Sequence, residues 1–225
     1  MNAASTAEIN YDKAIRAITG LEEQLTGAAA QLQALKADRD LSDEGRRSKV
    51  ATVRETTIAR YRSDRDEITK LLEVADREAN TAIVGDPTDT GMEGRKSRAG
   101  TRVARLINGG MTVTSAAEVF TEAGDLDALR ALRDEIPSVV ASVDPQDRLG
   151  ARVRSQRIRE VTITVDAMMA PLLPEPEGRA ARLRGNIETA QDWVRVLGED
   201  TIKTLNGRGT GLSASSFHRD MLVEV

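Results

Sequence analysis

Apolar and small residues recur at steps of three and four, or multiples of these, along two long stretches of the first 84 residues. Such spacing places them on one narrow face of an α-helix, so each stretch is predicted to be a long helix that pairs along this face. We call these positions the apolar seam. In the first stretch they are Tyr11, Ile15, Ile18, Leu25, Ala29 and Leu32, widened by Leu21 and Leu35, and in the second Ile58, Tyr61, Ile68, Leu72, Ala75, Ala79 and Ala82.

Helix start signals set the expected bounds of these two helices. The segment Ser5-Thr6-Ala7-Glu8 has the pattern of a capping box, which predicts a first helix from Ser5 to about Arg39. Residues 38–45 are predicted to turn the chain, with Ser42 as the N-cap of a second helix that runs to about Val84. Two long helices joined by so short a turn are expected to form an antiparallel, coiled-coil-like hairpin.

Shorter elements are expected after the hairpin. Glycine, proline and aspartate between Gly85 and Gly91 predict a linker over residues 85–97. The helices expected next are Thr101 to Asn108, a capped helix from Ser115 to about Ala123, Leu126 to about Glu135 ahead of Pro137, a segment that starts at Pro145, and about Glu177 to Leu205.

One stretch of this second half fits two patterns. Val161 to Val165 alternates like a β-strand, but the longer series through Ile158, Met168 and Leu172 has helical spacing, which favours a helix. The sequence therefore predicts an all-α protein. Its expected parts are a hairpin at 1–84, a linker at 85–97, a smaller multi-helix region at 98–206 and a flexible Gly/Ser-rich tail at 207–225.

Composition supports elongated helices over a compact globule. Aromatic residues make up 2% of the 225 residues, hydrophobic residues 40% and charged residues 30%. Because aromatic side chains bury the most area per residue, a compact core of this length normally uses more of them. The net charge of −4 argues against a field that draws the whole chain to nucleic acid or an acidic membrane, and the lack of cysteine excludes disulfides and thiolate metal sites.

Catalytic patterns are absent from the sequence. The single histidine, His218, lies in the tail, and Gly207 to Gly211 follows a helix without the Gly-Lys-Ser/Thr of a phosphate loop. Asp86, Thr88 and Thr90 begin a calcium-loop spacing that has no later glutamate. We therefore expect no enzyme activity, no catalytic residue, no cofactor and no metal.

Two groups of basic residues and the tail are candidate contact sites. Helix-borne arginines can line a phosphate backbone or pair with acidic helices of the same or another copy. The expected anionic-partner contacts are Arg98, Arg102, Arg105, Arg152 and Arg159. In the tail, Phe217, Leu222 and Val223 suit docking on a neighbour, with terminal disorder as the alternative.

The turn from Leu41 to Val50, and the segment Gly124 to Arg133, resemble small helical proteins encoded near the head genes of tailed bacteriophages. This resemblance implies a scaffold, capsid-associated or connector protein that binds itself and a capsid subunit, in the host cytoplasm or the virion. The residues themselves predict a non-enzymatic helical protein that acts by self-association through Tyr11, Ile15, Ile18, Leu25, Leu32, Ile58, Tyr61, Ile68 and Leu72. A nucleic-acid-associated accessory protein is the alternative, and no signal peptide or membrane segment is expected.

Overall fold

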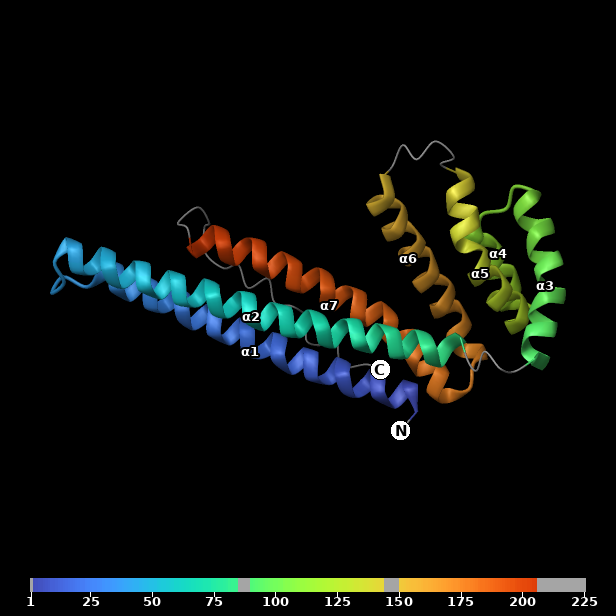
Figure 1. The fold of residues 1–225 in the computed structure, drawn as a ribbon, viewed down its shortest axis with the longest axis horizontal. Helices are drawn as coiled ribbons and strands as arrows, with labels where there is room; N and C mark the ends of the chain where they lie inside the picture. Colours follow the sequence, from blue (N-terminus) through green and yellow to red (C-terminus); the bar gives the residue numbers. More distant parts are fainter. Residues whose placement is uncertain (1, 85–89, 144–149, 206–225) are drawn as a thin grey trace. The chain divides into compact units, whose positions relative to one another are not determined.

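A computed structural model of the chain describes residues 2–84, 90–143 and 150–205 (Figure 1). In these ranges the fold is helical throughout and contains no strand, which confirms the predicted all-α class. The helices are α1 (Ala3–Ala37), α2 (Asp43–Val84), α3 (Thr90–Asn108), α4 (Val113–Glu122), α5 (Leu126–Val143), α6 (Gly150–Met169), the 3-10 helix η1 (Ala170–Leu172) and α7 (Glu175–Leu205).

The described residues divide into two compact units. Unit 1 consists of residues 2–7, 76–84, 90–143 and 150–185, and unit 2 consists of residues 8–75 and 186–205. Two of the long helices, α2 and α7, contribute residues to both units.

Unit 2 contains the predicted helical hairpin. Its turn is held by Ser42, whose Oγ accepts a hydrogen bond from the Gly45 amide at 3.1 Å, so the predicted N-cap of α2 is correct. The Arg46 guanidinium donates to the carbonyl oxygens of Asp38 (2.7 Å) and Leu41 (3.2 Å), which lie in the turn between the two helices. These bonds fix the connection between the two helices.

The predicted start of α1 is wrong by a few residues. The side chain of Asn2 accepts a hydrogen bond from the Ser5 amide at 2.9 Å, and the helix begins at Ala3. Asn2 is therefore the N-cap, and Ser5 lies inside the first turn. Asparagine and serine are equally good N-cap residues, so the sequence contains two possible helix starts close together, at Asn2 and at Ser5.

The last helix packs on the hairpin within unit 2, beside α2 in Figure 1. The Trp193 indole N–H donates to Glu22 Oε1 at 2.9 Å, which joins α7 to α1. The Tyr61 hydroxyl donates to the Val194 carbonyl oxygen at 3.4 Å, which joins α2 to α7. Gly198 faces the ring and hydroxyl of Tyr61, where an added Cβ would collide, so the absence of a side chain allows this close approach.

Unit 1 is a cluster of shorter helices in which α5 contacts α3, α4 and α6. Its first complete helix, α3, starts at Thr90, so the part of the predicted linker from Thr90 to Ser97 is helical. Ala99 and Val103 are buried on the inner face of α3. Glycines at 91, 94 and 100 lower the local helix propensity, and the burial of this face outweighs that cost.

The short helix α4 is capped by Thr112, whose side chain accepts from the Ser115 amide at 3.1 Å, and not by Ser115 as predicted. Gly124 ends this stretch with a φ of +64°, a left-handed conformation that glycine adopts without strain. Asp125 caps α5, because its Oδ1 accepts a hydrogen bond from the Ala128 amide at 3.1 Å.

Helix α5 continues through Pro137 to Val143, beyond the end predicted near Glu135. Proline within a helix costs one hydrogen bond and a contact with the carbonyl four residues earlier, and this usually ends the helix. Here Ile136 and Val140 lie on either side of Pro137 and are both buried. Their burial keeps the chain helical.

The ambiguous stretch from Val161 to Val165 is helical, as the longer pattern predicted, and lies in α6. The helix ends at Met169, and η1 carries the chain to α7, which starts at Glu175 instead of Glu177. Gly178 lies directly over the Ala170 carbonyl oxygen, which an added Cβ would approach to 2.7 Å. This contact allows η1 and α7 to pack closely.

Candidate functional site

The apolar seam is buried within one copy of the chain. Of the nine residues predicted to mediate self-association, Ile15 and Ile58 are half-buried, and the others are at most 6% exposed. The buried ones are Tyr11, Ile18, Leu25, Leu32, Tyr61, Ile68 and Leu72. The seam residues thus pack α1 against α2 and pack both helices against α7.

The seam is less well covered near the turn of the hairpin. The turn between α1 and α2 lies beyond the end of α7 in Figure 1, and we call residues 35–53, the turn and the helix ends beside it, the hairpin tip. Within the tip, Leu35, Leu41, Val50 and Val53 are half-buried, whereas Leu32 and Leu25 just before it are buried. The hairpin tip therefore presents a strip of aliphatic side chains along two helices that no third described helix covers.

The charges of the hairpin tip are mixed. Asp43 pairs with Arg46 at 3.3 Å across the start of α2. The hairpin tip contains similar numbers of basic and acidic side chains, so neither sign of charge dominates. The basic ones are Lys36, Arg39, Arg46, Arg47 and Lys49, and the acidic ones are Asp38, Asp40, Asp43 and Glu44.

Two tyrosines in unit 2 differ in how their hydroxyls are satisfied. The Tyr11 hydroxyl is buried and has no hydrogen-bond partner among the described residues, whereas the Tyr61 hydroxyl donates to Val194. Burial raises the pKa of the Tyr11 hydroxyl well above its usual value, and the nearby Asp12 carboxylate raises it further. Burial also raises the pKa of Tyr61.

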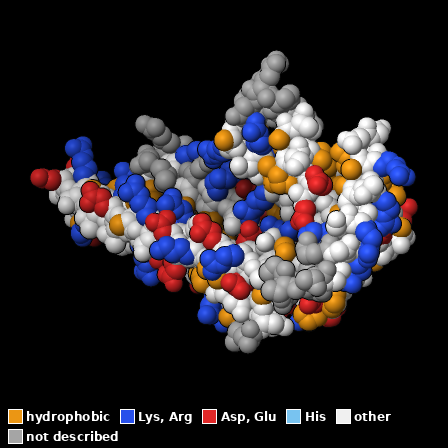
Figure 2. Space-filling view, turned by 45° about the vertical axis from the view of Figure 1, so that its right-hand side comes forward, with side chains coloured by type: hydrophobic (Ala, Val, Ile, Leu, Met, Phe, Trp, Pro, Cys, Tyr) orange, Lys and Arg blue, Asp and Glu red, His pale blue; other side chains and the backbone are white. Residues whose placement is uncertain are grey.

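The first predicted group of arginines lies on α3 and is partly neutralised by unit 1 itself. Arg102 pairs with Asp125 at 2.7 Å and Arg95 with Asp127 at 3.4 Å. Arg98 and Arg105 are exposed and have no ion-pair partner among the described residues. Figure 2 shows basic side chains in a column at the right-hand side of the surface, where α3 lies. Two of the three predicted contacts on this helix are therefore free.

The second group lies on α6 and is split. Arg152 is exposed, as expected for a contact residue. Arg159 is half-buried and pairs with Asp76 at 3.5 Å, so the structure uses it inside unit 1. Asp76 therefore competes for Arg159 with any outside anion, and the contact of Arg159 with an anionic partner stays a prediction. Arg148, together with the tail candidates Phe217, Leu222 and Val223, lies outside the described residues.

A buried ionic network in unit 1 was not predicted from the sequence. Asp166 on α6 is 0% exposed and accepts hydrogen bonds from Arg133 of α5 and Arg184 of α7. Arg184 Nε also donates to Asp76 Oδ1 of α2 at 2.9 Å, and Arg133 donates to Asn80 of α2. The network joins four helices through one fully buried carboxylate.

The charges of this network reinforce one another. Burial alone lowers the pKa of the Arg184 guanidinium, but the carboxylates of Asp166 and Asp76 outweigh burial, and the pKa lies above the usual arginine value. Arg184 is therefore a permanent cation that holds Asp166 and Asp76 together. A signal for this network exists in the sequence, because Asp166 is the only charged residue between Val161 and Pro174.

Comparison of the chain with family models, with curated proteins and with solved structures finds no match. Among the described residues, no group of three or more His, Asp or Glu side chains is placed to hold a metal ion. No helix in the described ranges has the length and apolar character needed to cross a bilayer.

Proposed function

We propose that the chain is a structural or assembly protein that self-associates through the hairpin tip. The observation that carries this proposal is the change along the apolar seam. Leu25 and Leu32 are buried, whereas Leu35, Val50 and Val53, which lie nearer the turn of the hairpin, are half-buried. A two-helix ribbon leaves such a seam open on one side, and an additional helix closes it.

A second copy of the hairpin tip is the occupant that fits this strip best. Two tips laid side by side in opposite directions bring two helices of each copy into one four-helix arrangement. The strip is then covered by the same aliphatic residues of the partner, as a two-fold interface requires. The mixed signs of the flanking charges favour such pairing, because each basic residue meets acidic neighbours on the second copy.

The bonds within the turn also favour a contact role. Arg46 and Ser42 satisfy the backbone groups at the turn, so the tip is ordered before any partner arrives. An ordered surface loses less conformational entropy on association than a flexible one.

The test is the mass of the full-length protein in solution, measured by light scattering after size exclusion and by sedimentation equilibrium. The wild-type protein is expected to form an oligomer, and Val53→Glu is expected to be a monomer because the charge would be buried between copies. The matched control is Val119→Glu, which places the same charge at an exposed valine of unit 1 and is expected to leave the oligomer intact.

Circular dichroism and the fluorescence of the single tryptophan, Trp193, establish that each variant is folded. A monomeric wild-type protein contradicts the proposal. An oligomer that survives Val53→Glu also contradicts it, because association would then use another surface.

In its finer form the proposal names a bacteriophage head as the assembly. The resemblance of residues 41–50 and 124–133 to helical proteins encoded near phage head genes supports this form. Co-sedimentation of the untagged protein with capsid shells or their precursors is then expected. If the protein does not co-sediment, the proposed role in a bacteriophage head is contradicted. The proposal of self-association is tested separately, by the mass measurements above.

The alternative is a nucleic-acid-associated accessory protein, and the free guanidinium groups of Arg98 and Arg105 are the observation in its favour. It predicts binding that weakens steeply with salt and is lost in the Arg98→Glu/Arg105→Glu variant. The pairing of Arg95 and Arg102 with aspartates reduces the positive charge of the same surface, so we place this alternative second.

A further inference from the structure

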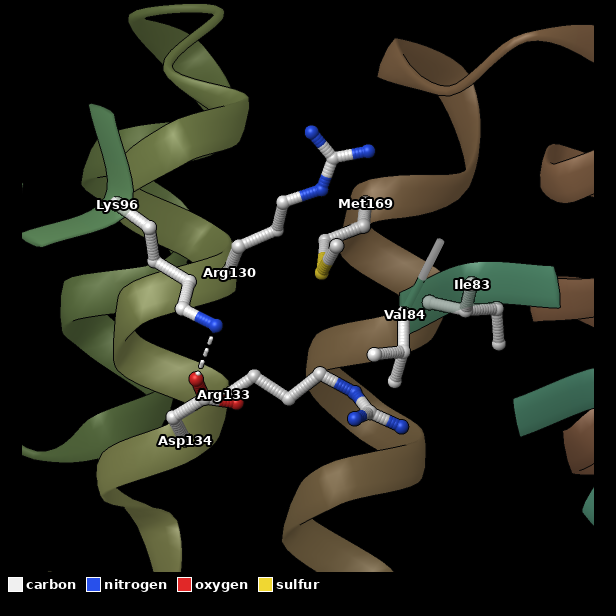
Figure 3. A pocket seen from close by; sticks show the side chains of 7 residues that line it. All are labelled: Ile83, Val84, Lys96, Arg130, Arg133, Asp134 and Met169. Atoms are coloured by element: carbon white, nitrogen blue, oxygen red, sulfur yellow. Dashed lines mark ion pairs between the residues drawn. The ribbon is translucent and has the colours of Figure 1, made fainter. Parts of the chain in front are cut away.

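Unit 1 contains a small pocket between α3, α5 and the ends of α2 and α6 (Figure 3). Its open space is about 270 Å³, including the solvent at the mouth. One side is apolar and the other is lined mainly by cations. The lining residues are Ile83, Val84, Lys96, Arg130, Arg133, Asp134 and Met169.

The basic residues of this pocket differ in their partners. Lys96 pairs with Asp134 at 2.7 Å, and Arg133 is bound to Asp166 and Asn80 of the ionic network. Arg130 has no hydrogen-bond or ion-pair partner among the described residues, and its Nε is buried without an acceptor. Figure 3 shows its guanidinium extending from α5 toward α6, beside Met169.

The Nε groups of Arg46, Arg54 and Arg159 also lack an acceptor among the described residues, so what distinguishes Arg130 is that its costly unpaired N–H lies at a pocket. The charges around the pocket indicate what is missing. Among the described residues that line the pocket or belong to the adjoining network, five are cations and three are carboxylates. The cations are Lys96, Arg130, Arg133, Arg159 and Arg184, and the carboxylates are Asp76, Asp134 and Asp166.

We propose that this pocket binds a small oxyanion, the phosphate or carboxylate group of a small molecule, with Arg130 as its principal ligand. An oxyanion supplies the acceptor that Arg130 Nε lacks and reduces the excess of positive charge. The planar guanidinium matches two oxygens of either group at once. The pocket is small, so it suits an anionic group of a few atoms and not a large ligand.

The probe for this site is inorganic phosphate, and the readout is the width of its ³¹P NMR resonance in the presence of the full-length protein at constant ionic strength. Wild-type protein is expected to broaden the resonance in a saturable way. Arg130→Gln, which keeps a polar side chain without the charge, is expected to weaken binding on the order of tenfold or more, because a charge-assisted hydrogen bond is lost.

The matched control is Arg98→Gln, which removes an unpaired arginine of α3 outside the pocket and is expected to broaden the resonance as wild type does. If Arg130→Gln does not fold, Arg130→Lys takes its place; it keeps the charge, loses the two-pronged geometry and is expected to bind with intermediate strength. Succinate in competition with phosphate distinguishes the two chemistries, since the anion that displaces the other at lower concentration identifies the preferred group.

Equal broadening by wild type and Arg130→Gln overturns the proposal, because the phosphate would then be bound elsewhere. The absence of saturable broadening, with no displacement or thermal stabilisation by succinate, also overturns it. Loss of binding in Arg98→Gln would assign the anion to the α3 surface instead. None of these results depends on the oligomeric state that tests the proposed function.

Discussion

The two units of this chain are stabilised by different kinds of interior. The interior of unit 2 is an apolar seam in which Ile68 and Leu72 are at most 1% exposed and most polar groups stay at the surface. The interior of unit 1 contains Asp166 with two arginines bound to it, among buried aliphatic residues of α5 and α6. The stability of unit 2 depends on buried apolar area, whereas the stability of unit 1 also depends on the geometry of its charged groups.

This difference has consequences for what each unit can do. An apolar seam is non-directional, so it can continue beyond α7 along the hairpin tip and accept another helix. A buried ionic network requires each donor and acceptor in place, because an unpaired charge inside a protein is costly. We infer that unit 2 suits repeated association and that unit 1 suits a fixed arrangement around a site, such as the Arg130 pocket.

The largest expected effect is that of Asp166→Asn in unit 1. The substitution keeps the shape of the side chain but leaves Arg133 and Arg184 buried without their shared anion. We expect the free energy of unfolding to fall by about 3–5 kcal/mol, the usual cost of breaking a buried ion pair. Urea denaturation followed by far-ultraviolet circular dichroism measures this change.

The control is Asp192→Asn, which breaks an exposed pair with Arg195 on α7 and is expected to have almost no effect. A sharper form replaces Asp166, Arg133 and Arg184 together with aliphatic residues of similar size. If unit 1 needs the network for its stability, the triple variant is as unstable as Asp166→Asn. If the cost comes only from unpaired charge, the triple variant recovers most of the loss.

The second prediction concerns the seam of unit 2. Ile68 is fully buried, and Ile68→Ala is expected to lower the free energy of unfolding by about 2–5 kcal/mol, from lost burial and the cavity left behind. Val53→Ala removes less volume at a half-buried position of the hairpin tip and is expected to cost less than half as much. Trp193 fluorescence in urea follows this unit, since the indole bonds to Glu22. Equal costs at the two positions would contradict the difference in coverage along the seam.

The sequence predicted unit 2 better than unit 1, and the reason lies in the same difference. Helical spacing of residues such as Ile18, Ile68 and Leu72 is a local pattern, and it indicated both the long helices and their buried face. Ser42 is likewise a local signal and gave the correct start of α2. Local patterns suffice where the interior is a continuous apolar stripe.

The features of unit 1 that sequence analysis missed depend on contacts between residues far apart in the chain. The pairing of Arg133 with Asp166 cannot be predicted from either helix, because a single helix does not indicate which polar residue meets a partner on another helix. The sequence predicts the end of α5 before Pro137, whereas the burial of Ile136 and Val140 keeps this proline inside the helix. The Arg130 pocket was missed for the same reason, since its lining comes from four separate helices.

The smallest expected effect concerns the two tyrosines of unit 2. Tyr11→Phe removes a buried hydroxyl that has no partner in the described part of the chain, so the free energy of unfolding at neutral pH is expected to stay constant or rise by up to about 1 kcal/mol. Tyr61→Phe removes a hydrogen bond to Val194 and is expected to lower it by about 0.5–1 kcal/mol. Urea denaturation at neutral pH separates the two variants by the sign of the change.

The pH dependence of the same variants extends this test. Burial raises the pKa of Tyr11 and of Tyr61 in the folded state, so the contribution of each to stability is complete below the pKa of an unfolded tyrosine, about 10, and is lost as the pH rises above it. Between about pH 8 and about pH 11 the wild-type protein is therefore expected to lose stability, and Tyr11→Phe to lose less of it. Identical losses in wild type and Tyr11→Phe would show that the Tyr11 hydroxyl reaches solvent, and the seam of unit 2 would then be less tightly closed at its start than at Ile68.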